Sequence, residues 1–213
     1  MWLLKEHEYT EYINIINFYL NNFDNPQKEI QLLCRKICDE IILKYILSVL
    51  STEEHQSIWG PRLDQLFIDF YTTEKEYDFF NSVKTNVENH MVSLKDNGFL
   101  AFPWKKRGLV DIFHQFGKSD FCWQQDANHS ITLVKPFNIY FVNGGNHSIA
   151  CGKFFDKSGV LECDSAIDYS NILKKYHFNG EYYLNDERKK INKPFHKELT
   201  VLFLLGKILI EIN

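Results

Sequence analysis

The sequence lacks the patterns that identify several common protein classes. None of its five cysteines belongs to a Cys-x-x-Cys pair, which argues against a zinc ribbon. The chain contains neither a Gly-x-Gly-x-x-Gly fingerprint nor a phosphate-loop motif, so neither of those nucleotide sites is predicted. It also has no low-complexity segment and no long array of repeats. We interpret the cysteines as reduced, buried thiols of a cytosolic protein.

Long apolar runs are also absent. The longest apolar stretch, at 199–210, is interrupted by Lys207 and is too short to span a bilayer. The N-terminus becomes acidic at Glu6, which argues against a secretory signal. We therefore expect no membrane span and a cytoplasmic location, with secretion by a route that needs no N-terminal signal left open.

The composition is that of a globular protein with a slight excess of negative charge. Hydrophobic residues make up 45% and charged residues 24% of the 213 residues, and the formal net charge is −4. This charge argues against broad binding to nucleic acid, because such binding depends on Lys and Arg. With 18 Phe and 11 Tyr, the core is expected to be rich in aromatic residues.

The apolar pattern divides the chain near residue 100. Apolar residues recur at helical spacing in the first part, and we predict helices over about 12–20, 26–49 and 74–95, the last ended by Asn97-Gly98. The second part combines patterns typical of strands, of a hairpin and of helices. We predict strands at 121–123, 131–134, 139–142 and 160–163, a hairpin at 178–183, and helices at 108–116, at 169–176 and from Pro194 onward.

These patterns predict an α+β fold. A helical N-terminal lobe, residues 1–99, packs on a small mixed sheet with flanking helices, residues 100–213. The two parts form either two domains or one continuous domain.

The four residues Asn-His-Ser-Ile occur twice, at 128–131 and at 146–149. The second copy follows Gly144-Gly145, and the stretch 140–152 is typical of a strand, a sharp glycine turn and a helix start. Free amides in such a turn attract an anion or a phosphate group. The alternative is a purely structural turn, in which Ser148 caps the helix and His147 bonds to neighbouring backbone.

Asp126 lies three residues before His129. Together with His147 these residues form either a metal site of two histidines and one carboxylate, or an acid–base relay in which Asp126 orients one histidine. Ser148 is a weaker candidate nucleophile, because its surroundings do not match Gly-x-Ser-x-Gly.

Several of these motifs together resemble an uncharacterised bacterial family. Its members carry Pro-Trp-x-x-x-Arg, Asp-x-x-His and Gly-Asn-His-Ser motifs in that order, and the resemblance covers about residues 100–213. It implies a shared polar site formed by Trp104, Arg107, Asp126, Asn128, His129, Asn146, His147 and Ser148.

The glycine turn has a second, more remote resemblance. Residues 144–148 are similar to the Gly-x-His-Arg turn of the ParB and sulfiredoxin superfamily, which binds nucleotide phosphate. Ser148 stands where that superfamily has Arg, so Arg107 or Lys153 would have to supply the positive charge.

We therefore expect a polar ligand site for a small molecule, with phosphate or nucleotide binding and hydrolase activity as its function. The expected catalytic residues are Asp126, His129, His147 and Ser148, and the expected ligand-binding residues are Trp104, Arg107, Asn128, Gly144, Gly145 and Asn146. The alternative is a protein-interaction module without catalysis, such as a toxin, defence or secreted effector component. The sequence identifies no metal or cofactor.

Overall fold

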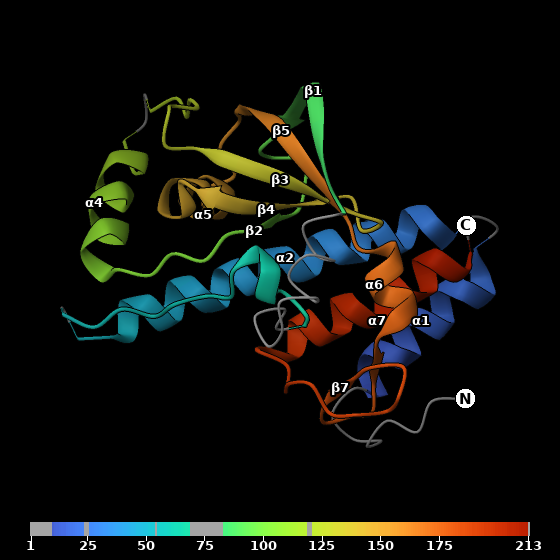
Figure 1. The fold of residues 1–213 in the computed structure, drawn as a ribbon. Helices are drawn as coiled ribbons and strands as arrows, with labels where there is room; N and C mark the ends of the chain where they lie inside the picture. Colours follow the sequence, from blue (N-terminus) through green and yellow to red (C-terminus); the bar gives the residue numbers. More distant parts are fainter. Residues whose placement is uncertain (1–9, 24–25, 54, 69–82, 119–120, 213) are drawn as a thin grey trace.

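The computed structural model describes residues 10–23, 26–53, 55–68, 83–118 and 121–212. Their elements confirm the predicted α+β class. In Figure 1 the long helix α2 runs beneath a five-stranded sheet, with α4 at one end of the molecule and α1, α6 and α7 at the other.

The helices of the first part follow the predicted periodicity. α1 spans Thr10–Asn22 and α2 spans Pro26–Ser51. Buried residues of α2 recur every three to four positions, as a helix that packs along one stripe requires: Ile30, Cys34, Ile37, Cys38, Ile41, Ile42, Tyr45, Ile46 and Val49. A short 3-10 helix, η1, spans Leu63–Gln65. The sequence also indicates Asp24 as a cap for α2, but Asp24 lies outside the described residues.

The sheet is mixed, with strand order β1-β5-β3-β4-β2. Its strands are β1 (Lys84–Ser93), β2 (Phe99–Leu100), β3 (Ser130–Lys135), β4 (Ile139–Gly144) and β5 (Val160–Asp168). β2 is parallel to β4 and β3 is parallel to β5, whereas the β1–β5 and β3–β4 pairs are antiparallel.

The other elements surround this sheet. They are α4 (Lys106–Phe116), α5 (Asn146–Phe154), α6 (Ser170–Lys175), α7 (Lys197–Glu211) and the two-stranded hairpin of β6 (His177–Phe178) and β7 (Tyr183–Leu184). The hairpin confirms the prediction for 178–183, and Gly180 at its turn has φ +96°. α7 begins three residues after Pro194.

Three predictions are wrong, the first being that all five cysteines are buried, because Cys122 is exposed. Residues 84–93, expected in the helix 74–95, form strand β1, and 74–82 lie outside the described residues. Residues 121–123 form no strand, although Trp123 is buried. β1 pairs with β5 from Lys84↔Ile167 to Ser93↔Val160, so pairing with a distant strand determines the conformation of this segment. The division of the chain into two parts near residue 100 stays a prediction. The pairing of β1 with β5 joins residues on both sides of that division.

The core has one part on each side of the sheet. Ile131 and Val142 belong to the cluster that includes the buried face of α5, whereas Val134 and Phe141 belong to the cluster that includes α6 and α7. This division follows from the alternation of side chains along a strand.

Candidate functional site

The predicted strand, glycine turn and helix are confirmed. β4 ends at Gly144, Gly145 is the N-cap of α5 with φ +79°, and the helix begins at Asn146. A positive φ is strained for residues that carry a Cβ, so the turn geometry favours glycine at position 145.

The two Asn-His-Ser-Ile copies meet at this turn. A Cβ atom on Gly144 would lie 2.4 Å from the carbonyl oxygen of Asn128, and one on Gly145 would lie 2.4 Å from Cδ2 of His129. The first copy therefore packs against the glycines that precede the second, and both glycines are needed for the close approach.

Asn146 and His147 are hydrogen-bonded to the backbone segment that follows β2. Oδ1 of the buried Asn146 accepts a hydrogen bond from the Phe102 amide at 2.6 Å. Nε2 of His147 accepts hydrogen bonds from the amides of Trp104, at 3.3 Å, and Lys105, at 3.1 Å. Burial lowers the pKa of His147, in keeping with a neutral ring that accepts these bonds. This geometry matches the structural alternative for the turn, in which His147 bonds to neighbouring backbone.

His129 has different neighbours. Its Nδ1 lies 2.8 Å from Oδ1 of Asp126 and accepts a hydrogen bond from the Asp126 amide at 2.9 Å. Its ring packs edge-on against Trp123, whose Nε1 donates to Oγ of Ser148 at 2.9 Å. Nε2 of His129 is buried and has no hydrogen-bond partner among the residues that the structure describes.

Only some of the expected catalytic residues are therefore in contact with one another. Asp126 and His129 form a pair, but no hydrogen bond or ion pair links either residue to His147. Within the described residues, no three His, Cys, Asp or Glu side chains are grouped so that they could hold a metal ion. The catalytic roles stay predictions.

Arg107 lines a depression separate from the cleft beside the glycine turn, and Lys153 is paired with other groups. Arg107 is exposed on α4 and lines a separate depression with Lys106, Val110 and Asp111. Lys153 forms an ion pair with Asp39 at 3.2 Å and donates to the carbonyl of Asn97 at 2.8 Å. The resemblance to the ParB and sulfiredoxin turn is therefore not confirmed.

A cleft of about 470 Å³ lies beside the glycine turn. Its lining includes segment 59–64 and the aromatic residues Phe102, Trp104 and Phe141. Asn143 and Asn146, which flank Gly144-Gly145, also line the cleft, and so does Lys84 of β1. Of the expected ligand-binding residues, Trp104 and Asn146 are in this cleft. Arg107, Asn128, Gly144 and Gly145 are not among its lining residues.

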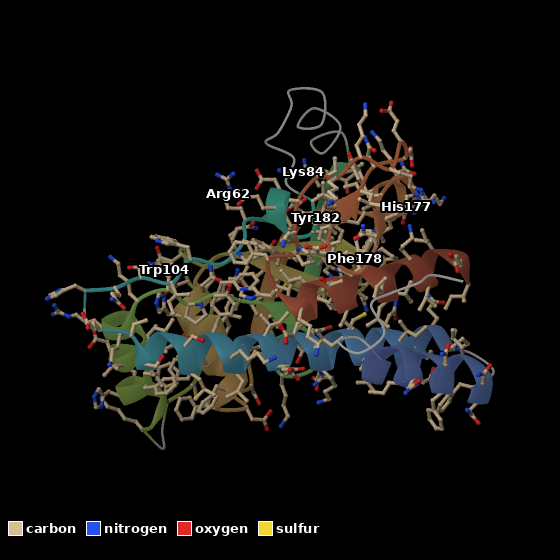
Figure 2. The ribbon with its side chains drawn as sticks, turned by 90° about the horizontal axis from the view of Figure 1, so that it is seen from below. Arg62, Lys84, Trp104, His177, Phe178 and Tyr182 are labelled. Atoms are coloured by element: carbon tan, nitrogen blue, oxygen red, sulfur yellow. The ribbon has the colours of Figure 1, made fainter. Side chains whose placement is uncertain are left out.

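The cleft has two cationic residues, Arg62 and Lys84, and Trp59 and Trp104 are among its aromatic residues; Trp59 and Arg62 belong to the same segment. Figure 2 shows Arg62 and Lys84 apart from Trp104. Nε of Arg62 lies 3.3 Å from Oδ1 of Asp64, a mostly buried carboxylate that partly balances the guanidinium charge. Trp59 stacks on Trp104 with ring centres 5.8 Å apart and planes 11° apart. Sequence reasoning missed Trp59, Arg62 and Lys84, because only the tertiary fold brings them together.

Polar side chains form a row across the same face of the sheet. Oγ1 of Thr132 lies 2.7 Å from Oγ of Ser165, and Nδ2 of Asn143 donates to Oγ1 of Thr132 at 2.8 Å. Thr132 is buried in spite of its hydroxyl group. These bonds orient Asn143 at the edge of the cleft.

A second cleft, of about 360 Å³, contains a cluster of ionisable groups that the sequence analysis also missed. The hydroxyl of Tyr45 lies 2.5 Å from Nε2 of His196, and Lys44 forms an ion pair with the buried Glu198. Burial lowers the pKa of His196 and raises that of Tyr45, so both groups are neutral near pH 7. Tyr45 lies on an apolar helix stripe, which gives no sign of this role in the sequence.

Comparisons with known proteins give one match. A family model described as a family of unknown function (DUF6710) matches residues 4–213, whereas the sequence resemblance covered only about 100–213. No curated protein and no solved structure matches the chain. In the described part of the chain, no helix combines the length and apolar character required to cross a bilayer.

Proposed function

We propose that this chain, which belongs to the family of unknown function DUF6710, binds a small phosphorylated molecule in the cleft beside its glycine turn. The observation that carries the proposal is the composition of that cleft. Lys84 and Arg62 contribute positive charge at one concave surface, and Asn143 contributes an exposed amide group. Cations and amide donors are the groups that bind phosphate oxygens in proteins.

The start of α5 supports the same ligand chemistry. The first intrahelical bond of α5 runs from the Ile149 amide to the Gly145 carbonyl. Among the described residues, the amides of 146–148 have no hydrogen-bond acceptor, so the positive end of the helix dipole lies at the first turn of α5, where Asn146 lines the cleft and His147 and Ser148 do not. A phosphate group would be stabilised there.

The size of the cleft and the charge of the chain favour a monomeric ligand. A volume of about 470 Å³ falls within the range of about 300–1,000 Å³ that is usual for small-molecule pockets. A net charge of −4 argues against an extended polyanion such as nucleic acid.

The proposal concerns binding alone. Hydrolysis by Asp126, His129, His147 and Ser148 stays a prediction. The proposal does not include it, because Nε2 of His147 and Oγ of Ser148 already accept hydrogen bonds within the protein. The alternative role as a protein-interaction module also stays a prediction.

A thermal-shift panel tests the proposal. The probes are pyrophosphate, ribose 5-phosphate and nucleoside mono- and triphosphates, each with and without Mg²⁺. A ligand present at 100 times its dissociation constant stabilises the folded state by about 2.7 kcal/mol, which raises the midpoint by several degrees. We expect at least one phosphorylated probe to give such a shift.

The variant Lys84→Gln locates the binding. Loss of a charge-assisted contact costs about 1.5–3 kcal/mol, so the affinity of Lys84→Gln for the bound probe should fall by roughly ten-fold or more. Lys174→Gln, which removes an exposed lysine of α6 outside the cleft, should bind as the unchanged protein does. No shift with any probe, or equal losses in the two variants, would contradict the proposal.

A further inference from the structure

We infer that the phosphorylated ligand is a nucleotide whose base stacks on Trp59, an inference that rests on the proposed function of the same cleft. Trp59 is the most exposed of the large hydrophobic residues in the described part of the chain, at 66% of its surface. Because Trp59 also lines the cleft, its exposed indole is available to a ligand there.

The aromatic platform is fixed before any ligand binds. Trp59 and Trp104 are stacked at 5.8 Å, and their backbones are held together by a hydrogen bond of 3.1 Å from the Ile58 amide to the Trp104 carbonyl. A β-bridge between Ser57 and Lys105 flanks this bond. Binding of a planar ring would therefore incur little cost for ordering these side chains.

His147 fixes the second indole of the platform. Its ring lies edge-on to that of Trp104, with centres 4.5 Å apart, and its Nε2 accepts hydrogen bonds from the amides of Trp104 and Lys105. Through these contacts, His147 of the Asn-His-Ser motif positions Trp104 in the platform.

The cleft separates aromatic and cationic groups in the way that a nucleotide separates its base from its phosphates. Trp104, on which Trp59 stacks, belongs to the aromatic part, and Figure 2 shows Trp104 apart from Arg62 and Lys84, which form the cationic part. A sugar phosphate would leave the indole platform exposed, whereas a neutral aromatic molecule would not use the cations. A base stacked on an aromatic side chain is bound more tightly by about 1–3 kcal/mol, or roughly 5- to 150-fold.

Isothermal titration calorimetry tests this inference with AMP, ATP, adenosine, ribose 5-phosphate and inorganic triphosphate as probes. AMP should bind roughly 5- to 150-fold more tightly than ribose 5-phosphate, and ATP should exceed triphosphate by a similar factor. Bound nucleotide should also quench tryptophan fluorescence. Adenosine should bind more weakly than AMP, because it lacks the phosphate group that the cations would contact.

The matched variants are Trp59→Ala, Trp59→Phe and Phe154→Ala. Trp59→Ala should reduce AMP affinity to that of ribose 5-phosphate without changing triphosphate binding, and Trp59→Phe should restore part of the loss. Phe154 is 47% exposed outside the cleft, so Phe154→Ala should have no effect on binding.

The two proposals fail in different ways. Equal binding of ATP and triphosphate, or unchanged AMP binding in Trp59→Ala, would overturn base stacking and leave phosphate binding in place. Equal binding of adenosine and AMP would overturn the phosphate contact instead. Absence of binding by every probe would overturn both proposals.

Discussion

The imidazole ring of His129 lies against the backbone of Gly145 so closely that a Cβ atom at Gly145 would be 2.4 Å from Cδ2 of the ring. Because Gly145 also has φ +79°, a side chain at this position would strain the backbone and would clash with the buried ring of His129. The contact joins the two Asn-His-Ser-Ile segments and positions the start of α5.

Gly145→Ala should lower the free energy of unfolding by about 2 kcal/mol or more, through strain and displacement of His129. Gly108→Ala in α4 is the matched control, because its Cβ would lie 3.5 Å from the nearest atoms of His147, which is ordinary contact. Alanine suits a helix interior better than glycine, so the control should be neutral or stabilising by up to about 1 kcal/mol. Urea unfolding measures both, and similar stabilities of the two variants would contradict the description of the turn.

Asn146 and Asn143 should have separable effects on stability and binding. Asn146→Ala leaves the Phe102 amide without its acceptor in a buried region, which should cost about 1–3 kcal/mol of stability. Asn143 is exposed, so Asn143→Ala should cost less than about 1 kcal/mol while weakening the binding of phosphorylated probes. Equilibrium unfolding and calorimetry on the same samples measure the two effects. A larger loss of stability in Asn143→Ala would be inconsistent with the bonding described.

The stability of the protein should fall on acidification, in part through His147. Burial lowers the folded-state pKa of this residue below its value in the unfolded chain, so the unfolded state binds more protons between the two values. The stabilisation is therefore fully present above about pH 6.5, the ordinary histidine value, and is lost as the pH falls through the folded pKa. His147→Gln should have a shallower loss of stability between about pH 7 and 5.

The exposed His55 provides a control for the loss of a histidine side chain. The denaturant midpoint of His55→Gln at pH 7 should match that of the unchanged protein. If His147→Gln retained the full dependence on pH, the role assigned to burial of His147 would be incorrect.

The contact between Tyr45 and His196 should contribute measurable coupling energy. Their O···N separation of 2.5 Å joins α2 to the N-cap of α7. In a double-mutant cycle of Tyr45→Phe and His196→Ala, the two losses of stability should be non-additive by about 0.5–1.5 kcal/mol, the net worth of one hydrogen bond. Strict additivity would show that the bond does not stabilise the fold.

Local patterns in the sequence predict the elements whose own residues determine them. The stripe of α2 from Ile30 to Val49 and the glycine turn after β4 both follow from spacing and residue type. β1 could not be predicted in this way, because Lys84–Ser93 acquires its strand form by pairing with β5, more than 60 residues later.

The same reasoning explains what could be predicted of the site. Trp104 and Asn146 were selected by their motifs, and both line the cleft. Trp59 and Lys84 have no motif of their own and reach the cleft only through tertiary packing. Arg107 was selected by sequence resemblance, but it lies on the exposed face of α4.

A crystal structure of the protein soaked with AMP would test the central claim most directly. The account predicts phosphate density within hydrogen-bond distance of Lys84 or Arg62, with the base stacked on Trp59. Density confined to the cleft of Tyr45 and His196, or no bound nucleotide at millimolar concentration, would contradict it.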